Sequence, residues 1–519
     1  MHTLQRWVLH PLLLSAYPVL FLFAQNTADQ ISLGVLWAPL AAAIGGAAVL
    51  LLIGWAFLGD VHRAGIAASV LVAAFFSFGH AWNIAGEFLG QQSILLAAWG
   101  LLIAAGLLAA WRVRSRARTM TAYLNLLVAI PLAFTLVDLG EFMVTRGVPG
   151  VVLESVDGLL DGEDGQRPDI YYLVFDRYAG SPALDRHFGF DNEPFLDELE
   201  ARGFYVARDS VANYPKTALS LVSTLDMEYL DGNALNAEAV APADQGPINR
   251  KLGGRLLVPF SLKEIGYEFV LIPSWWPPAA TNVDADITLA YDGTSEFSLA
   301  LLETTMVGAL TGPAGEVDPL SAAELPKYTL HQLQRLHEAP QLPGPQFVFA
   351  HFIIPHPPYL FDRDGSSVTP AEAAERSDEE EYLRQLEFTN AQILMLVDEI
   401  KAGASSNGAA IIIQADEGPF PERYAANGDT FRWEEASAAE LEIKYRILNA
   451  YHLPGVNAEA VGLSPSITPV NSFRVVFNAL FDADLPLLPD HVYAHTDYQH
   501  FYDFIEVTDR IPSWPMPQP

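Results

Sequence analysis

Cysteine is absent from this chain of 519 residues. Its absence excludes disulfide bonds, zinc sites built from thiolates and cysteine nucleophiles. Lysine is scarce as well: only six of the 29 basic residues are lysine, and 62 acidic residues oppose them. A surface this acidic repels a phosphate backbone, so we expect no nucleic-acid partner.

Charge and hydropathy divide the chain into two parts. The first 150 residues hold 7 basic and 5 acidic residues, which leaves 22 basic against 57 acidic residues in the remainder. The first part also contains five apolar stretches long enough for membrane-spanning helices. These stretches cover about 7–24, 33–58, 64–86, 93–111 and 121–140. We therefore expect a multi-pass protein of the cell membrane with an acidic globular domain.

The positions of arginine predict the orientation of this region. Arg6 precedes the first stretch, Arg63 lies between the second and third, and four arginines at 112–118 lie between the fourth and fifth. By the positive-inside rule these segments are cytoplasmic, and five crossings then place everything after residue 140 outside the cytoplasm. Ionisable residues within the stretches are few, which favours a plain anchor over a transport path.

The expected organisation is a transmembrane region of five helices at 1–141, a juxtamembrane linker at 142–168 and an extracytoplasmic catalytic domain at 169–519. The linker is rich in Gly and Asp. From 169 onward, short apolar runs alternate with helical patterns, of which 378–401 is the longest. This alternation is typical of an α/β fold whose sheet is covered by helices on both faces.

Chemically useful side chains stand at the ends of three apolar runs in this domain. They are Asp176, His351, His356, Asp416 and Glu417. Short apolar runs flanked by turn-forming residues predict buried parallel strands. Ligands of such sheets bind outside the carboxyl ends of the strands. We therefore expect these side chains to meet at one edge of one sheet.

The segment 213–220 has the pattern of a helix start, with Pro215 in the first turn and Thr217 two residues later. A hydroxyl in a first turn faces unpaired backbone N–H groups and the positive end of the helix dipole, which suits an oxyanion or a phosphate. A capping threonine is the commoner explanation. The carboxylates of Asp176 and Asp416 favour a hydroxyl beside a divalent metal instead.

In their order along the chain, these residues resemble the alkaline phosphatase/sulfatase superfamily. The features are an Asp at the end of a first strand, a Thr about forty residues later, the segment HFIIPHPPY, and an acidic pair followed by Gly. With five expected spans, the chain is most similar to the lipoteichoic acid synthases and phosphoethanolamine transferases. The resemblance implies an alkaline-phosphatase-like α/β/α sandwich, one divalent metal, a Thr nucleophile and a His contact to the substrate phosphate. The implied residues are Asp176, Thr217, Asp416 and Glu417 for the metal, Thr217 for the nucleophile and His356 for the contact.

The acidic pair departs from the Asp-His-Gly pattern usual in that family, because Glu417 stands where the His is expected. A carboxylate hardens the site, so Mn, Mg or Ca is expected in preference to Zn. Alternatively the site has lost its metal, and the domain is then a catalytically silent binding or scaffold domain.

Three further residues have both a functional and a structural explanation. His351 is either a site residue or a buried histidine at a strand end. Lys216 either neutralises a substrate phosphate or faces solvent. Trp275, with Trp276 beside it, either lines a substrate pocket or packs in the core. His495 and His500, in the tail segment HTDYQHFYDF, either approach the site from the C-terminal end or lie at the surface, and we expect the surface.

The sequence thus predicts a membrane-anchored, metal-dependent phosphoryl-group transferase or phosphodiesterase of the sulfatase-like family, acting outside the cytoplasm. The expected substrate is a phospholipid headgroup or a cell-envelope glycan. A sulfuric ester hydrolase is the nearest rival. It is disfavoured because the segment around Thr217 lacks the Cys/Ser-x-Pro-x-Arg pattern of the formylglycine enzymes.

Overall fold

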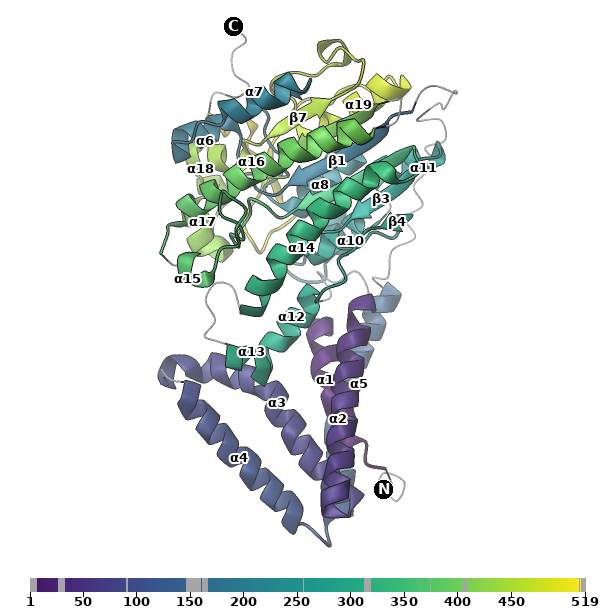
Figure 1. Cartoon of the computed structure of the whole chain (residues 1–519), viewed down its shortest axis with the longest axis vertical. Coiled ribbons are helices and arrows are strands. Elements are labelled where there is room, and N and C mark those ends of the chain that lie inside the picture. Colours follow the sequence, from purple (N-terminus) through teal and green to yellow (C-terminus); the bar gives the residue numbers. More distant parts are fainter. Residues whose placement is uncertain are drawn as a thin grey trace. The chain divides into compact units, whose positions relative to one another are not determined.

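The structure, a computed structural model, describes residues 7–26, 33–89, 92–145, 160, 167–254, 256–311, 319–373, 375–404, 408–512 and 514. The chain divides into two compact units (Figure 1). The first unit joins 1–149 with 294–323, and the second joins 150–293 with 324–519. Most of the expected linker lies outside the described residues, so its boundaries stay predictions.

The described part of the first unit is helical. Its helices are α1 (His10–Gln25), α2 (Trp37–Leu58), α3 (Val61–Leu89), α4 (Gln92–Arg112), α5 (Ala117–Thr145), α12 (Glu296–Glu303) and α13 (Met306–Thr311). Helices α2 to α5 contain four segments long and apolar enough to cross a membrane. Helix α1 has 16 residues, a length of about 24 Å against a hydrocarbon core of about 30 Å. The fifth span therefore stays a prediction.

Helix α1 is nevertheless packed within the first unit. The side chain of Asn125 on α5 accepts hydrogen bonds from the backbone N–H groups of Leu9 (3.2 Å) and His10 (2.8 Å) at the start of α1. Further along the helix, Phe23 meets Phe297 of α12 edge to face, with ring centroids 5.9 Å apart. The insertion at 294–323 thus adds α12 to the apolar core around α1, which the sequence pattern did not indicate.

The second unit is built on a mixed seven-stranded sheet in the order β2-β7-β6-β1-β5-β3-β4. Its strands are β1 (Asp169–Phe175), β2 (Tyr205–Val206), β3 (Glu268–Ile272), β4 (Ile287–Thr288), β5 (Gln346–Phe352), β6 (Ala409–Gln414) and β7 (Asn449–His452). The central strands β6, β1, β5 and β3 run parallel, whereas β7 pairs antiparallel with both β6 and β2. A separate pair joins β8 (Tyr493–His495) to β9 (Phe504–Glu506).

Helices cover both faces of this sheet, because alternate side chains of each central strand enter two different cores. One core receives α6 (Ser181–Phe188), α7 (Glu193–Ala201), α14 (Pro319–Glu338), α16 (Asp378–Gly403) and α18 (Ala438–Tyr445). The other receives α8 (Thr217–Asp226), α10 (Gly246–Leu252), α11 (Leu257–Glu264) and α19 (Ser472–Phe481). Shorter helices are α9 (Gly232–Glu238), α15 (Pro370–Ala373) and α17 (Glu422–Asn427). The predicted α/β class is confirmed.

Candidate active site

Asp176, His351 and Asp416 meet at the carboxyl edge of the sheet. Strand β1 lies between β5 and β6, so the residues that end these three strands emerge side by side. Asp176 follows β1, His351 is near the end of β5, and Asp416 follows β6. One ligand-type atom from each of these buried residues lies within 4.8 Å of the other two.

Four polar atoms of this cluster lack a hydrogen-bond partner in the described part of the chain, although Nε2 of His351 lies 3.5 Å from Oδ2 of Asp176. Oδ1 of Asp176, Oδ2 of Asp416 and both ring nitrogens of His351 are buried and accept or donate no hydrogen bond within the described residues. Leaving such groups unpaired costs about 1–3 kcal/mol each, so their convergence points to a ligand that satisfies them together. Two carboxylate oxygens and one imidazole nitrogen are donors that divalent zinc, manganese and iron accept. The residues therefore fit a metal ion.

The charges of the cluster favour the same ligand. Burial raises the pKa of Asp416 well above its usual value, and the negative charges of Asp176 and Glu417 raise it further. Burial also raises the pKa of Asp176, but nearby histidines and Arg177 outweigh that effect and hold it below its usual range. Burial lowers the pKa of His356 to about 3, so that ring is neutral near pH 7. Near pH 7 the positive charge beside Asp176 therefore comes from Arg177. A divalent cation would stabilise both carboxylates as anions.

Thr217 is the first residue of α8, as the sequence pattern predicts for a helix start. Lys216 is the N-cap residue in an extended conformation, so Pro215 precedes the helix and is not in its first turn. The side chain of Thr217 lies near Asp416 and lowers the pKa of that carboxyl, which burial raises overall. The hydroxyl therefore lies at once beside the carboxylate cluster and at the positive end of a helix.

Glu417 is not among the three clustered residues. Its Oε1 lies 2.9 Å from Nζ of Lys444 and 3.5 Å from Nε of Arg177. Lys444 is fully buried, and its ammonium also donates to the carbonyl of Gly418 at 3.0 Å. In return, the Gly418 N–H donates to the Lys444 carbonyl at 2.7 Å. The carboxylate expected to bind a metal is thus held by two cations.

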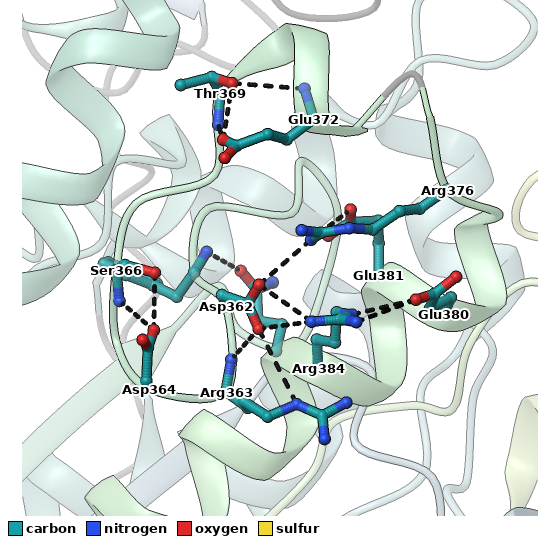
Figure 2. A network of polar contacts seen from close by, with 12 residues as sticks. Asp362, Arg363, Asp364, Ser366, Thr369, Glu372, Arg376, Glu380, Glu381 and Arg384 are labelled. Atoms are coloured by element: carbon teal, nitrogen blue, oxygen red, sulfur yellow. Dashed lines mark hydrogen bonds and ion pairs between the residues drawn. The ribbon is translucent and has the colours of Figure 1, made fainter.

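His356 lies on the loop after β5, and contacts with α16 fix this loop. The amide of Gln385 donates to the His356 carbonyl at 3.0 Å and accepts from the N–H of Leu360 at 2.6 Å. Figure 2 shows the second attachment, in which Arg384 contacts Asp362 at 2.9 Å. The imidazole Nδ1 of His356 contacts the carbonyl of Pro357. The loop and the ring are therefore held in place before any substrate binds.

Lys216 is partly buried and points to the same site. Its ammonium lies 4.5 Å from the ring centroid of Phe420, and burial lowers its pKa to about 8. Of the two tryptophans, Trp276 approaches the cluster, with its ring 5.9 Å from that of His351. Trp275 packs instead against the core on one face of the sheet. Lys216 therefore does not simply face solvent, and its contact with a substrate phosphate stays a prediction, as does a pocket role for Trp275.

Sequence reasoning missed two residues of the site and placed a third wrongly. Arg177 follows Asp176 directly, so a basic residue next to the first acid was an available signal. Lys444 gave no signal, because nothing in its local sequence predicts that it is buried beside Glu417. His495 was expected at the surface, which is wrong: its side chain is buried, and charges on Lys216 and Lys444 help burial to lower its pKa to about 3.

Comparison with known proteins gives structural matches only. No family model and no curated protein sequence matches the chain. Among solved structures, the periplasmic domain of EptC from Escherichia coli in complex with Zn has 12% identity and a TM-score of 0.41, covering 68% of this chain and 96% of that one. The integral membrane lipooligosaccharide phosphoethanolamine transferase A from Neisseria meningitidis has 12% identity and a TM-score of 0.39, covering 91% and 95%.

A putative sulfatase from Bacteroides fragilis also matches, with 14% identity, a TM-score of 0.36 and coverage of 64% and 78%. The chain is similar to phosphoethanolamine transferases and sulfatases. These are the kinds of protein that the sequence motifs resemble. With TM-scores below 0.5 they assign no activity to this chain, which depends on the site's own residues.

Proposed function

We propose that the chain is a membrane-anchored, metal-dependent enzyme that transfers or hydrolyses a phosphoryl-linked group outside the cytoplasm, with Thr217 as nucleophile. One observation carries this proposal. The side chain of Thr217, at the start of α8, lies close enough to Asp416, a member of the buried Asp176, His351 and Asp416 cluster, to lower the pKa of that carboxyl. A capping threonine needs no such partner, whereas a nucleophile activated by a metal does.

Asp176, His351 and Asp416 would hold the metal. When bound there, a divalent ion lowers the pKa of an adjacent hydroxyl and stabilises negative charge on phosphoryl oxygens. In the first step the oxygen of Thr217 bonds to phosphorus, its proton passes to Asp416, and the ester bond to the donor alcohol breaks. The departing alkoxide takes a proton from water. The product of this step is a phospho-threonine.

His356 suits the second step better than the first. Its ring is neutral near pH 7, since burial lowers its pKa to about 3, and Nδ1 faces the Pro357 carbonyl. Nδ1 is therefore the protonated nitrogen, and Nε2 is free to accept. An acceptor hydroxyl or water gives its proton to Nε2 as it attacks phosphorus, the bond from phosphorus to Thr217 breaks, and the Thr217 oxygen takes back the proton held by Asp416.

The proposed substrate is a lipid headgroup or an envelope glycan, because the four apolar helices of the first unit would keep the site near a bilayer. The identity of the metal depends on which donors bind. Carboxylates alone favour manganese, magnesium or calcium, whereas a nitrogen from His351 makes zinc equally suitable.

Full-length protein in detergent tests this proposal with two chromogenic substrates, a phosphodiester and an aryl sulfate. Thr217→Ala should abolish phosphodiester cleavage, and Thr217→Ser should retain part of it. The matched control is Thr224→Ala, a buried threonine on the same helix whose hydroxyl bonds the Ser220 carbonyl at 2.8 Å. Full activity of Thr217→Ala would refute the nucleophile. A preference for the aryl sulfate would favour the sulfuric ester hydrolase.

Metal analysis separates the enzyme from a silent scaffold. Dialysed wild-type protein should contain one divalent ion per chain, and Asp176→Asn or Asp416→Asn should contain none. Wild-type protein that binds no ion after manganese and zinc loading would refute the proposal.

A further inference from the structure

Arg177 is held in an unusual conformation beside the proposed metal site. Its backbone is left-handed, with φ of 59°, which few residues other than glycine adopt. Its N–H donates to Oδ1 of Asp416 at 3.2 Å, and its carbonyl accepts from the hydroxyl of Tyr382 at 2.9 Å. We therefore read the strained backbone of Arg177 as the feature that directs the Arg177 side chain towards the site.

The guanidinium of Arg177 is anchored on one side only. Its central carbon lies 3.6 Å from the ring centroid of Phe420, and its Nε lies 3.5 Å from Glu417. Nε has no hydrogen-bond partner in the described part of the chain, so its contact with Glu417 is an ion pair alone; no hydrogen bond occupies the two terminal nitrogens there either, and 13% of the side chain is exposed. A planar pair of unused donors is the group that binds a tetrahedral oxyanion through two parallel hydrogen bonds.

Glu417 pairs with the Arg177 guanidinium on one side and with the Lys444 ammonium on the other. The Glu417 carboxylate is buried and near the negative charge of Asp416, so burying it with Arg177 as its single cation would be costly. Lys444 offsets that charge at 2.9 Å while its ammonium sits 3.9 Å above the same Phe420 ring. Gly418 lets the two segments approach, because a Cβ there would lie 2.2 Å from the Ile443 carbonyl oxygen.

We infer that Arg177 binds the transferred oxyanion, a phosphoryl or sulfuryl group, and that Glu417 is a positioning residue for Arg177 and not a metal ligand. The inference rests on the proposed function and adds to it the group that recognises the anion. Glu417, which replaces the expected histidine, therefore contributes to binding the substrate and not to binding the metal. His351 supplies the nitrogen donor that the replacement removed.

Two measurements on full-length protein in detergent test this inference: metal content by mass spectrometry, and the affinity of the metal-loaded protein for inorganic phosphate by calorimetry. Arg177→Met should retain the metal and weaken phosphate binding at least about tenfold, the effect of losing one charge-assisted hydrogen bond. Arg177→Lys should restore only part of the affinity, because an ammonium cannot form two parallel bonds. The matched control is Arg423→Met, since Arg423 also stacks on an aromatic ring, Phe431, and pairs with a glutamate, Glu440.

Glu417→Gln distinguishes the two roles of the carboxylate. It should retain one metal ion per chain and weaken phosphate binding about tenfold. The double variant Arg177→Met/Glu417→Gln should bind phosphate no more weakly than Arg177→Met alone, because Glu417 acts through Arg177. If Glu417→Gln fails to fold because Lys444 is left unpaired, Glu417→Gln/Lys444→Met removes the whole ion pair and is measured in its place.

Loss of the metal in Glu417→Gln, to the extent seen in Asp416→Asn, would overturn the inference and leave the proposed function standing. Unchanged phosphate affinity in Arg177→Met would overturn it as well. Absence of metal from the wild-type protein would instead refute the proposed function, so the two failures are distinguishable.

Discussion

Asp416→Asn should stabilise the metal-free protein and destabilise the metal-loaded protein. Ligand atoms of Asp176 and Asp416 lie within 4.8 Å of each other, so Coulomb's law at an effective dielectric of about 20 gives a repulsion of about 3.5 kcal/mol between two ionised carboxylates. Asparagine keeps the oxygen that accepts from the Arg177 N–H and removes the charge. We expect a gain of about 2–3 kcal/mol in chelator at pH 8, or roughly 4 °C in Tm for a unit of this size.

Thermal unfolding of full-length protein in detergent measures this effect, with chelator in one series and saturating manganese or zinc in the other. Metal should raise the Tm of the wild type and leave that of Asp416→Asn unchanged, because only the wild type binds the ion. Asp509→Asn, an exposed acid, is the control for a change of one charge. Equal stability of wild type and Asp416→Asn in chelator would show that the two carboxylates do not repel, and the metal-site reasoning would fail.

Three further predictions concern orientation, pH and packing. A periplasmic-type reporter fused after residue 519 should be active only outside the cytoplasm, and cytoplasmic activity would mean that α1 does not span. Because burial holds the pKa of His495 at about 3, below its unfolded value near 6.5, its contribution is complete above about pH 6.5 and is lost as pH falls. Denaturant titration should show the wild type losing about 2 kcal/mol more than His495→Phe between pH 7 and 5. Gly418→Ala should cost about 2–3 kcal/mol by the same measurement, since its Cβ would meet the Ile443 carbonyl; no loss would show that this contact yields freely.

The local patterns of the second unit were readable from the sequence. The three apolar runs are the parallel strands β1, β5 and β6, and the helical pattern at 378–401 is α16. The helix start at Thr217 was also correct. These features depend on residues close together in the chain, whose periodicity and turn chemistry act before any tertiary contact forms.

The membrane region was readable to a lesser extent. Hydropathy identified the four long spans, because length and composition alone decide whether a helix can cross a bilayer. It did not indicate that 294–323 groups with these helices. That segment is far from them in sequence, and packing such as that of Phe297 against Phe23 and of Met306 against Phe78 reveals the association.

The sequence by itself determined which residue types reach the carboxyl edge of the sheet, because the end of each strand follows from local apolar runs and turn formers; the order of the strands came from the tertiary structure. The sequence could not decide which ion or side chain each of those residues contacts in the folded protein. Whether Glu417 faces a metal or a cation depends on Lys444, which is distant in sequence and arrives from the end of α18. Likewise, His495 is buried because β8 docks beside Trp433. Such pairings are set by the desolvation and charge of groups that only the folded chain brings together.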